Sequence, residues 1–350
     1  MKPVADLDRA APTATDGEIA AINLESARRR AWTRFAQDPL SPGVAEEILD
    51  DERLAAQFLG DIDALDRLET LAADFARADG SFRAALVQAQ VASALHRFEE
   101  AQEQLARAAS LGGPADEIRR HALTNDQACG VELGAVLAAR RRMTSESGRL
   151  EDLVPLGAVL ADLEQWDEAD LVYRQALSSY GGVSPFPLAW ACFQLGTLWG
   201  ELAPAPSPDL AADWYRCALA YLPGYVKARV HLAEILAGRG QTRAAEALLR
   251  VALACRDPEV RWRLADVLLA KGRFEEAGQE LDAARAGFEE LLRKHRLAFA
   301  DHAAEFYAGS GGDNLRALEL ARANAANRPT RRALEQAKAI AQGGEPSPWP

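Results

Sequence analysis

The stretch LGAVLADLEQWDEADLVYRQAL, residues 156–177, decides the fold. In this stretch Gly157 is followed twelve residues later by Ala169, and Tyr173 and Ala176 come next at helical spacing. Small residues at this offset let two antiparallel helices approach closely, and the larger residues between them fill the layer. We therefore expect two short helices joined by a turn.

The same series returns at three other places in the chain. It is found at Leu232/Ala233, Ala245, Leu249, Ala252 and Leu253, at Leu264/Ala265, Ala277, Leu281 and Ala284, and at Ala89, Ala101, Leu105 and Ala108. Ala101 and Ala169 are 68 residues apart, which is two units of about 34 residues, so the weak copy between them stays in phase. A hairpin of this size cannot bury its apolar face alone and must stack on its neighbours.

This pattern resembles the tetratricopeptide repeat (TPR) family, in the form of a bacterial-type solenoid, over residues 82–326. The matching features are the small and aromatic residues quoted above, the turn glycines Gly240, Gly272 and Gly312, and the inter-repeat Pro223. The resemblance implies an all-α fold, a right-handed superhelical solenoid of antiparallel helix hairpins. It also implies a protein that binds other proteins or peptides and is not an enzyme.

The expected elements are all helices, because no run shows the period-two alternation of a strand. Single helices are expected at 18–37, 43–58 and 61–78, hairpins at 82–110, 115–144, 150–180, 186–222, 225–255, 258–296 and 298–326, and a last helix at 331–341. The helix at 274–296 has no breaker, so we expect it to alter the superhelical pitch or to project from the body.

The chain divides into five expected parts. They are a disordered tail (1–17), degenerate N-terminal helical repeats (18–80), a TPR-like solenoid (81–327), a polar C-terminal capping helix (328–341) and a flexible tail (342–350).

The formal net charge of −12 limits the kinds of partner. It argues against general nucleic-acid binding, which needs a basic surface to neutralise phosphates, and against an anionic membrane surface. It favours a soluble, acidic protein that attracts basic partners. No stretch of about 20 apolar residues is present to span a membrane.

The compartment is left open by the N-terminus. Residues 1–17 lack the apolar core of a signal peptide, so a cytoplasmic location is the default expectation. A tail rich in Ala, Pro, Thr and Asp also remains after a signal peptide has been removed, which leaves a periplasmic or other exported location open.

The four cysteines are scattered and contain no CxxC pair. We expect buried free thiols, since free cysteine packs as a small apolar residue. Cys192 and Cys217 lie on the two helices of one expected hairpin, so a disulfide between them remains open in an oxidising compartment.

In the TPR family the first helix of each hairpin lines a concave groove. The family's groove positions fall here on Glu151, Asp162, Trp190, Phe193, Glu201, Lys227, Glu234, Trp262, Asp266, Phe299, His302 and Phe306. This aromatic and acidic surface suits a peptide with apolar and basic side chains. The alternative is that Trp190, Phe193 and Trp262 belong to the core of imperfect repeats.

Signals for catalysis are weak. The chain has no HExxH, GxSxG or GxxxxGK[ST] motif, so we expect no catalytic residue and no cofactor. His295 and His302 are seven residues apart, and Glu305 follows His302 by three, which makes these residues a weak candidate for a transition-metal site. Solvated or capping histidines are the favoured alternative.

These observations predict a non-catalytic protein–protein interaction scaffold or adaptor that binds a peptide or partner protein in its concave groove. Two other interpretations stay open. One is an exported accessory protein of a secretion, envelope or metal-handling system. The other is a small-molecule or metal sensor that uses His295, His302 and Glu305. We expect no nucleic-acid partner, and self-association remains open.

Overall fold

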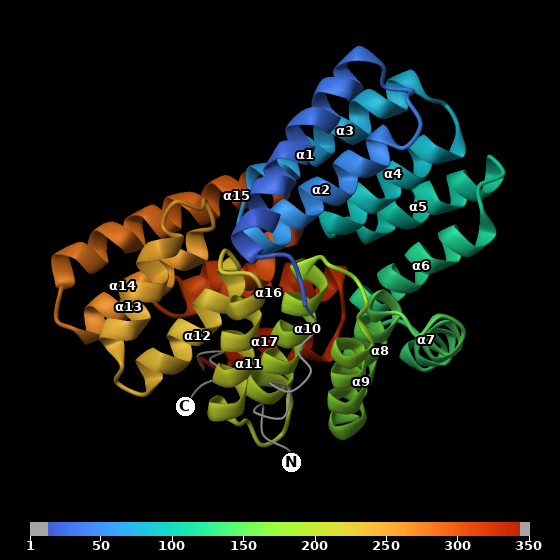
Figure 1. Cartoon of the computed structure of the whole chain (residues 1–350). Coiled ribbons are helices and arrows are strands. Elements are labelled where there is room, and N and C mark those ends of the chain that lie inside the picture. Colours follow the sequence, from blue (N-terminus) through green and yellow to red (C-terminus); the bar gives the residue numbers. More distant parts are fainter. Residues whose placement is uncertain (1–12, 344–350) are drawn as a thin grey trace.

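The computed structural model describes residues 13–343, which form seventeen α-helices, one π-helical turn and no strand (Figure 1). The all-α prediction is therefore confirmed. The helices are α1 (Gly17–Gln37), α2 (Val44–Leu59), α3 (Asp63–Ala78), α4 (Phe82–Ala94), α5 (Phe98–Ser110), α6 (Ala115–Cys129), α7 (Leu133–Ser147), α8 (Leu150–Asp162), α9 (Trp166–Ser179), α10 (Pro185–Thr197), η2 (Leu198–Leu202), α11 (Pro208–Tyr221), α12 (Val226–Gly238), α13 (Thr242–Ala252), α14 (Pro258–Ala270), α15 (Phe274–Ala308), α16 (Asn314–Asn327) and α17 (Arg331–Ala341).

Of the tails expected at 1–17 and 342–350, residues 1–12 and 344–350 lie outside the described residues; Thr15, Asp16 and Gly17 are ordered, since Thr15 N–H donates to the Val183 carbonyl, Asp16 caps α1 and Gly17 begins it. The division of the chain into degenerate repeats, solenoid and cap stays a prediction.

Proline and capping residues explain several helix starts. Pro185, Pro208 and Pro258 stand at the first positions of α10, α11 and α14, where a missing N–H costs nothing and the fixed φ suits a helix. The Asp257 carboxylate also accepts a hydrogen bond of 3.0 Å from the Glu259 N–H, and the Thr330 hydroxyl caps α17 through the Ala333 N–H.

The turns inside the hairpins repeat one backbone conformation. His96, Gly130 and Glu164 have φ of 56°, 69° and 62°, and each follows the one before it by the length of one repeat. Gly240 and Gly272 take the same left-handed conformation, with φ of 72° each. Because His96 and Glu164 adopt it without being glycine, tertiary packing imposes the turn there. The regular interval confirms that the weak copy at 115–144 is in phase.

The two helices of a hairpin meet where a small residue on one helix faces a larger residue on the other, and the two volumes are complementary. Tyr173 lies on Gly157, where an added Cβ would come within 2.5 Å of the ring, and Tyr215 lies in the same way on Gly196, at 2.4 Å. Where the first residue is alanine, as at Ala233, leucine stands sixteen residues later in place of tyrosine. Each hairpin thus balances the volume of its two contact residues.

The superhelix closes on itself. Figure 1 shows the N-terminal helices α1–α5 beside α15, with α16 and α17 enclosed near the middle of the molecule. Asp66 on α3 accepts hydrogen bonds from Lys294 (2.6 Å) and His295 (2.7 Å) on α15, and Phe299 packs against the N-terminal core. The first and last repeats are therefore in direct contact, although they lie near opposite ends of the sequence.

The long helix agrees with its prediction in one respect and differs in another. We expected it to end at residue 296, and α15 is indeed interrupted by non-helical backbone at His295, where φ is −133° and ψ is 50°, before it continues to Ala308. We also expected it to alter the superhelical pitch or to project from the body, but it does not project, because it packs on α14 and contacts α3. The kink lets the first half pack on α14 and α3 while the second half becomes the first helix of the last hairpin. The long helix therefore joins the two ends of the superhelix.

Cys192 is a free, buried thiol on α10, so no disulfide joins it to Cys217. Burial raises the pKa of the Cys192 thiol well above its ordinary value, which makes it unreactive at neutral pH. None of the helices in residues 13–343 has both the length and the apolar character needed to cross a bilayer.

Replacing Gly157 by alanine should destabilise the chain. The new Cβ would meet the buried Tyr173 ring at 2.5–2.8 Å. Overpacking of this kind typically costs about 1–3 kcal/mol, more than the gain of up to about 1 kcal/mol that alanine brings to a helix interior. Urea unfolding followed by circular dichroism measures the change in the free energy of unfolding.

Two further variants make this test specific. Gly157→Ala with Tyr173→Leu recreates the alanine–leucine pair of other hairpins, so the double variant should be more stable than the sum of the single changes by about 1 kcal/mol or more. Gly278→Ala is the control, because its Cβ would meet nothing within 4 Å in α15 and should stabilise the helix. Additive effects of the two changes at 157 and 173 would contradict the size-matching argument.

Candidate functional site on the inner face

Ionisable side chains gather on the inner face of the superhelix. They come from η2, α12, α14 and the second half of α15, most of which are first helices of hairpins or their continuation. We name this set the inner ionic cluster; it comprises Glu201, His231, Glu234, Glu259, Arg263, Asp266, Asp301, His302 and Glu305. Six of its nine members are carboxylates, so the inner face is acidic.

His231 lies at the centre of the cluster between two carboxylates. Its Nδ1 is 2.9 Å from Glu201 Oε1 and 3.5 Å from Glu234 Oε2, and its ring stacks on Tyr215. Burial would lower the pKa of His231, but Glu201, Glu234 and Glu259 together outweigh it and raise that pKa to about 9. Burial would likewise raise the pKa of Glu201, and the charges of His231 and Arg332 lower it to about 2.

Arg263 joins two layers of the cluster. Its guanidinium is 2.7 Å from Glu234 Oε1 and 3.8 Å from Asp266 Oδ2, and it lies 3.6 Å over the Trp262 ring. A guanidinium at this distance gains a cation–π interaction in addition to its ion pairs. The Trp262 ring therefore helps to hold the Arg263 guanidinium in place.

The C-terminal part of the chain lies across the cluster. We name residues 327–341 the closing segment. Arg332 Nη2 lies 3.1 Å from Glu201 Oε2, Arg331 Nη1 lies 2.6 Å from Glu164 Oε1, and Arg328 pairs with Asp301. The Glu201 side chain is only 3% exposed, whereas Arg332 is 61% exposed. A buried carboxylate is thus neutralised by an arginine at the surface.

The structure corrects two expected groove residues. Trp262 is 3% exposed and Phe306 is fully buried; their rings meet edge to face at 5.6 Å and both pack on Phe288. The prediction that they face a partner is wrong for this structure, because the kinked α15 folds its own aromatic residues onto α14. For Trp262 the core alternative is the right one.

The other expected groove residues fall into three groups. Phe193 and Trp190 are half-buried, and Phe193 packs on Tyr215, Tyr225 and His231. Phe299 packs between the N-terminal and C-terminal cores. The polar residues that keep some exposure are Glu151, Asp162, Lys227, Glu234, Asp266 and His302, of which Glu234, Asp266 and His302 join the inner ionic cluster. Whether these residues bind a partner stays a prediction.

The weak metal candidate is separated by the kink. His295 faces α3, with Nε2 2.7 Å from Asp66 Oδ1, while His302 Nδ1 is 3.6 Å from Glu259 Oε2 on α14. Glu305 accepts a hydrogen bond from Gln336. The expected trio of His295, His302 and Glu305 is therefore not brought together.

Asp66, Glu69 and His295 form a group of possible metal ligands that the sequence did not suggest. Opposite ring nitrogens of His295 face the two carboxylates, since Nε2 faces Asp66 and Nδ1 is 3.8 Å from Glu69. Lys294 and Arg97 already pair with these carboxylates. Because both carboxylates already have cationic partners, the group is better explained as an ionic contact between α3 and α15.

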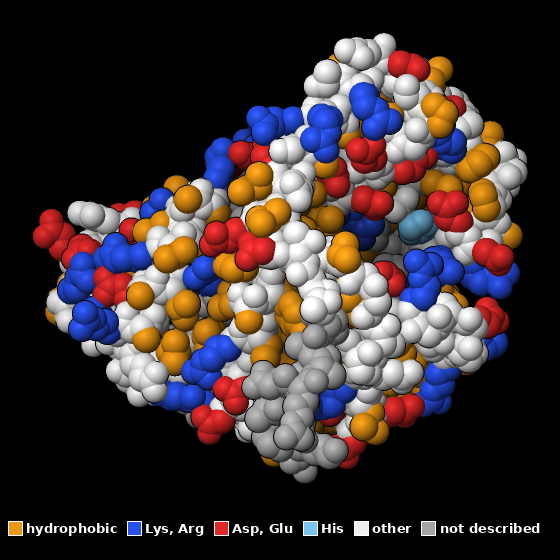
Figure 2. Space-filling model, in the orientation of Figure 1, with side chains coloured by type: hydrophobic (Ala, Val, Ile, Leu, Met, Phe, Trp, Pro, Cys, Tyr) orange, Lys and Arg blue, Asp and Glu red, His pale blue; other side chains and the backbone are white. Residues whose placement is uncertain are grey.

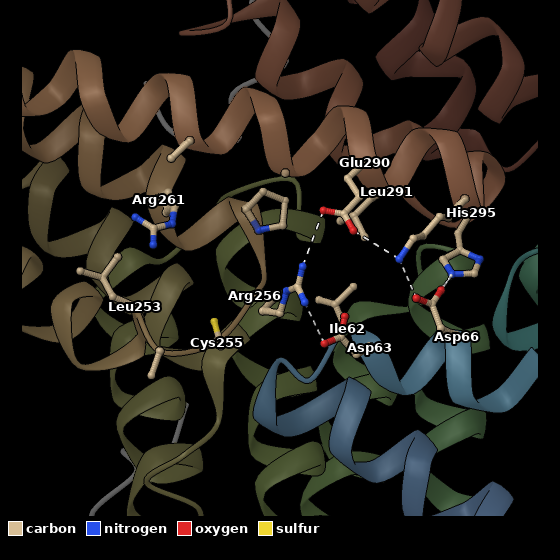
Figure 3. Close-up of a pocket in the computed structure, with 15 residues that line it drawn as sticks. Ile62, Asp63, Asp66, Leu253, Cys255, Arg256, Arg261, Glu290, Leu291 and His295 are labelled. Atoms are coloured by element: carbon tan, nitrogen blue, oxygen red, sulfur yellow. Dashed lines mark hydrogen bonds and ion pairs between the residues drawn. The ribbon is translucent and has the colours of Figure 1, made fainter.

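A cavity of about 300 Å³ lies beside this contact, outside the inner ionic cluster (Figure 3). Figure 3 shows Arg256 between Asp63 and Glu290, and Asp66 beside His295. Charges of opposite sign thus alternate around the cavity and pair with one another. The cavity lies where α3 meets the α13–α14 connection and the first half of α15.

Charges of both signs are also mixed on the outside. Figure 2 shows Lys and Arg interspersed with Asp and Glu over the face it presents, without a continuous region of one sign. The acidic character of the chain is therefore not displayed as one outer patch on this face.

Trp262→Ala should destabilise the protein instead of weakening a partner. Removing a buried tryptophan typically costs about 3–5 kcal/mol, and here Arg263 also loses its support. Trp190→Ala, at a half-buried position, should cost less. Urea unfolding of both variants checks this, and equal small losses would return Trp262 to the list of partner contacts.

The ion pair of His231 predicts how stability depends on pH. Because the folded pKa is about 9 and the ordinary value is 6.5, the stabilisation is complete below pH 6.5 and is lost as pH rises through 9. The difference between the two pKa values corresponds to a contribution of roughly 3 kcal/mol to the free energy of unfolding below pH 6.5. Unfolding free energies of the native chain and His231→Gln, measured at pH 6 and pH 9.5, should differ much less at the higher pH.

His121→Gln is the control for this measurement. Burial lowers the pKa of His121 to about 4, so this histidine is neutral at both pH values in the folded state, whereas in the unfolded chain it is mostly protonated at pH 6. Its replacement should therefore be more favourable at pH 6 than at pH 9.5, by about 0.8 kcal/mol, which is the opposite sign to His231→Gln. A pH-independent effect of His231→Gln would show that the pKa of His231 is not raised in the folded state.

Comparisons with known proteins give structural similarities alone. No family model and no curated protein matches the chain. A crystal structure of a tetratricopeptide repeat protein from Parabacteroides merdae has a TM-score of 0.42 and 15% identity, over 75% of this chain and 100% of that chain. The Cut9–Hcn1 structure of the APC/C has a TM-score of 0.42 and 12% identity, over 93% of this chain and 54% of that chain.

A third similar structure is a monomeric IFIT1 mutant with m7Gppp-AAAA, with a TM-score of 0.38 and 15% identity over 86% of this chain and 73% of that chain. These values do not decide any partner, so the exclusion of nucleic acid stays a prediction from charge. The fold is established by the molecule's own geometry. Stacked helix hairpins with matched small and large contact residues and a regular turn make this chain TPR-like.

Proposed function

We propose that this chain is a non-catalytic interaction scaffold whose inner face binds a basic, partly apolar peptide segment of another protein. The supporting observation is the pairing of acidic residues with arginines of the chain's own closing segment. Glu201 and Asp301 of the inner ionic cluster, and Glu164 in the turn between α8 and α9, each have an arginine partner there. The acidic residues of the inner face thus already hold a segment of the proposed chemistry.

Part of this face remains accessible. The side chains of Asp266 and His302 are 34% and 36% exposed. Trp190, on the inner helix α10, is half-buried. Trp166, half-buried at the start of α9, lies 5.8 Å from the Arg331 guanidinium. A partly exposed carboxylate and half-buried aromatic rings on the inner helices suit a segment that carries both basic and apolar side chains.

Photo-cross-linking to the full chain tests the proposal. The probe is a helical peptide of fifteen residues with Arg on one face, Leu and Ala on the other, and one benzophenone side chain. We expect saturable binding that weakens with salt, and cross-links in α8, α10, α12 and α14. A peptide with Glu in place of Arg is the matched control and should not bind.

A pair of variants locates the contact. Asp266→Asn should weaken the peptide by about fivefold, since one exposed ion pair contributes up to about 1 kcal/mol. Asp282→Asn makes the same change on an exposed part of α15 and should have no effect. Cross-links confined to the second helices α9 and α13, or equal binding of the acidic peptide, would contradict the proposal.

A further inference from the structure

We infer that the closing segment, residues 327–341, is an intramolecular ligand of the inner face, and that an external partner must carry the same chemistry to displace it. This inference rests on the proposed function. The external partner would be a segment of another protein. It would have an extended, basic stretch followed by a short alanine-rich helix that begins with two arginines.

The path of the closing segment is that of a bound peptide. Asn327 Nδ2 donates to the His96 carbonyl (2.9 Å), Thr330 lies against Gly130, and Arg331 reaches Glu164. These three partners are the equivalent left-handed turn residues of successive hairpins, each one repeat length from the next. The segment therefore contacts three successive repeats along the superhelix. An ordinary connection joins only neighbouring helices.

The backbone of this stretch is extended before it becomes helical. Arg328 has φ −138° and ψ 91°, and Thr330 has φ −68° and ψ 155°. Pro329 between them removes an N–H and disfavours helix at residue 328. An extended start lets successive side chains reach different hairpins.

The two arginines are placed against the preference of their own helix. Arg331 and Arg332 open α17, where the positive end of the helix dipole disfavours cations. Arg331 lies 3.6 Å from Glu335 within α17, but the shorter contacts of both arginines are outside the helix, with Glu164 at 2.6 Å and Glu201 at 3.1 Å. Recognition by these carboxylates, not local helix stability, explains arginines at this position.

Helix α17 is suited to release. It has eleven residues, fewer than the roughly 12–15 that an isolated helix needs to be even marginally stable. Only Ala333, Gln336 and Ile340 are buried, and Leu334 is 53% exposed. A helix that depends on a few tertiary contacts of this size can be exchanged for a matching external segment.

The test uses the full chain with Arg331→Glu and Arg332→Glu. Charge reversal should release the closing segment, seen as faster hydrogen–deuterium exchange in residues 331–341. A fluorescent peptide of residues 325–343 should then bind the variant at least about tenfold more tightly than it binds the native chain, because the site is no longer occupied. Circular dichroism confirms that the rest of the chain stays folded.

The control carries Arg293→Glu and Arg322→Glu. These arginines are exposed on α15 and α16, so the charge change is the same while the closing segment stays docked. Peptide affinity and exchange in α17 should equal those of the native chain.

Four results would overturn the inference. The first is unchanged hydrogen–deuterium exchange in α17 of the charge-reversed variant, and the second is a released segment without binding of the peptide. The third is global unfolding of the charge-reversed variant, together with exchange of α17 in the native chain that does not depend on salt. The fourth is a native dimer in which the two copies swap this segment. If the benzophenone peptide still cross-links to the inner face in any of these cases, the proposed function stands and the intramolecular ligand alone is rejected.

Discussion

The close approach of two helices at one small residue per hairpin is the constraint on which the structure depends. Tyr173 can lie flat on α8 only because Gly157 has no side chain, and Tyr215 lies on Gly196 in the same way. This contact fixes the distance between the helices of a hairpin. Repeated with a turn that returns once in each repeat, it fixes the curvature of the superhelix, and that curvature brings α15 against α3.

Closure has an electrostatic side. Buried carboxylates such as Glu201 are expensive unless a counter-charge accompanies them, and here His231 and Arg332 supply it from different parts of the chain. A buried ion pair adds little net stability, but removing one partner is costly. The inner ionic cluster therefore specifies which segments meet at the centre more than it strengthens the fold.

Much of the fold could be read from the sequence, because local pattern determines it; the last helix begins and ends where it was expected. An interruption near residue 296 was expected, and the kink lies one residue before it; the contact of His295 with Asp66 on α3 could not be read. Nor could the contact of Asn327 with His96, because no local periodicity relates positions so far apart in the chain. Glu201, Glu234 and Asp266 of the inner ionic cluster stood among the expected groove positions, whereas Glu259 and Asp301 did not. Trp262 and Phe306 were misplaced, because one residue type serves both a core and a binding surface.

These long-range contacts also determine how the chain folds. In an open solenoid each repeat touches only its neighbours, so folding can begin at any repeat and spread, and the ends fray independently. Here the N-terminal helices gain their final contacts with Lys294 and His295 only after most of the chain has been synthesised. We therefore expect hairpins to form early and the ring to close late, at a rate limited by contacts of high sequence separation. Once closed, the ring ties helices α1–α16 together, so they should unfold as one cooperative unit while α17 can open locally.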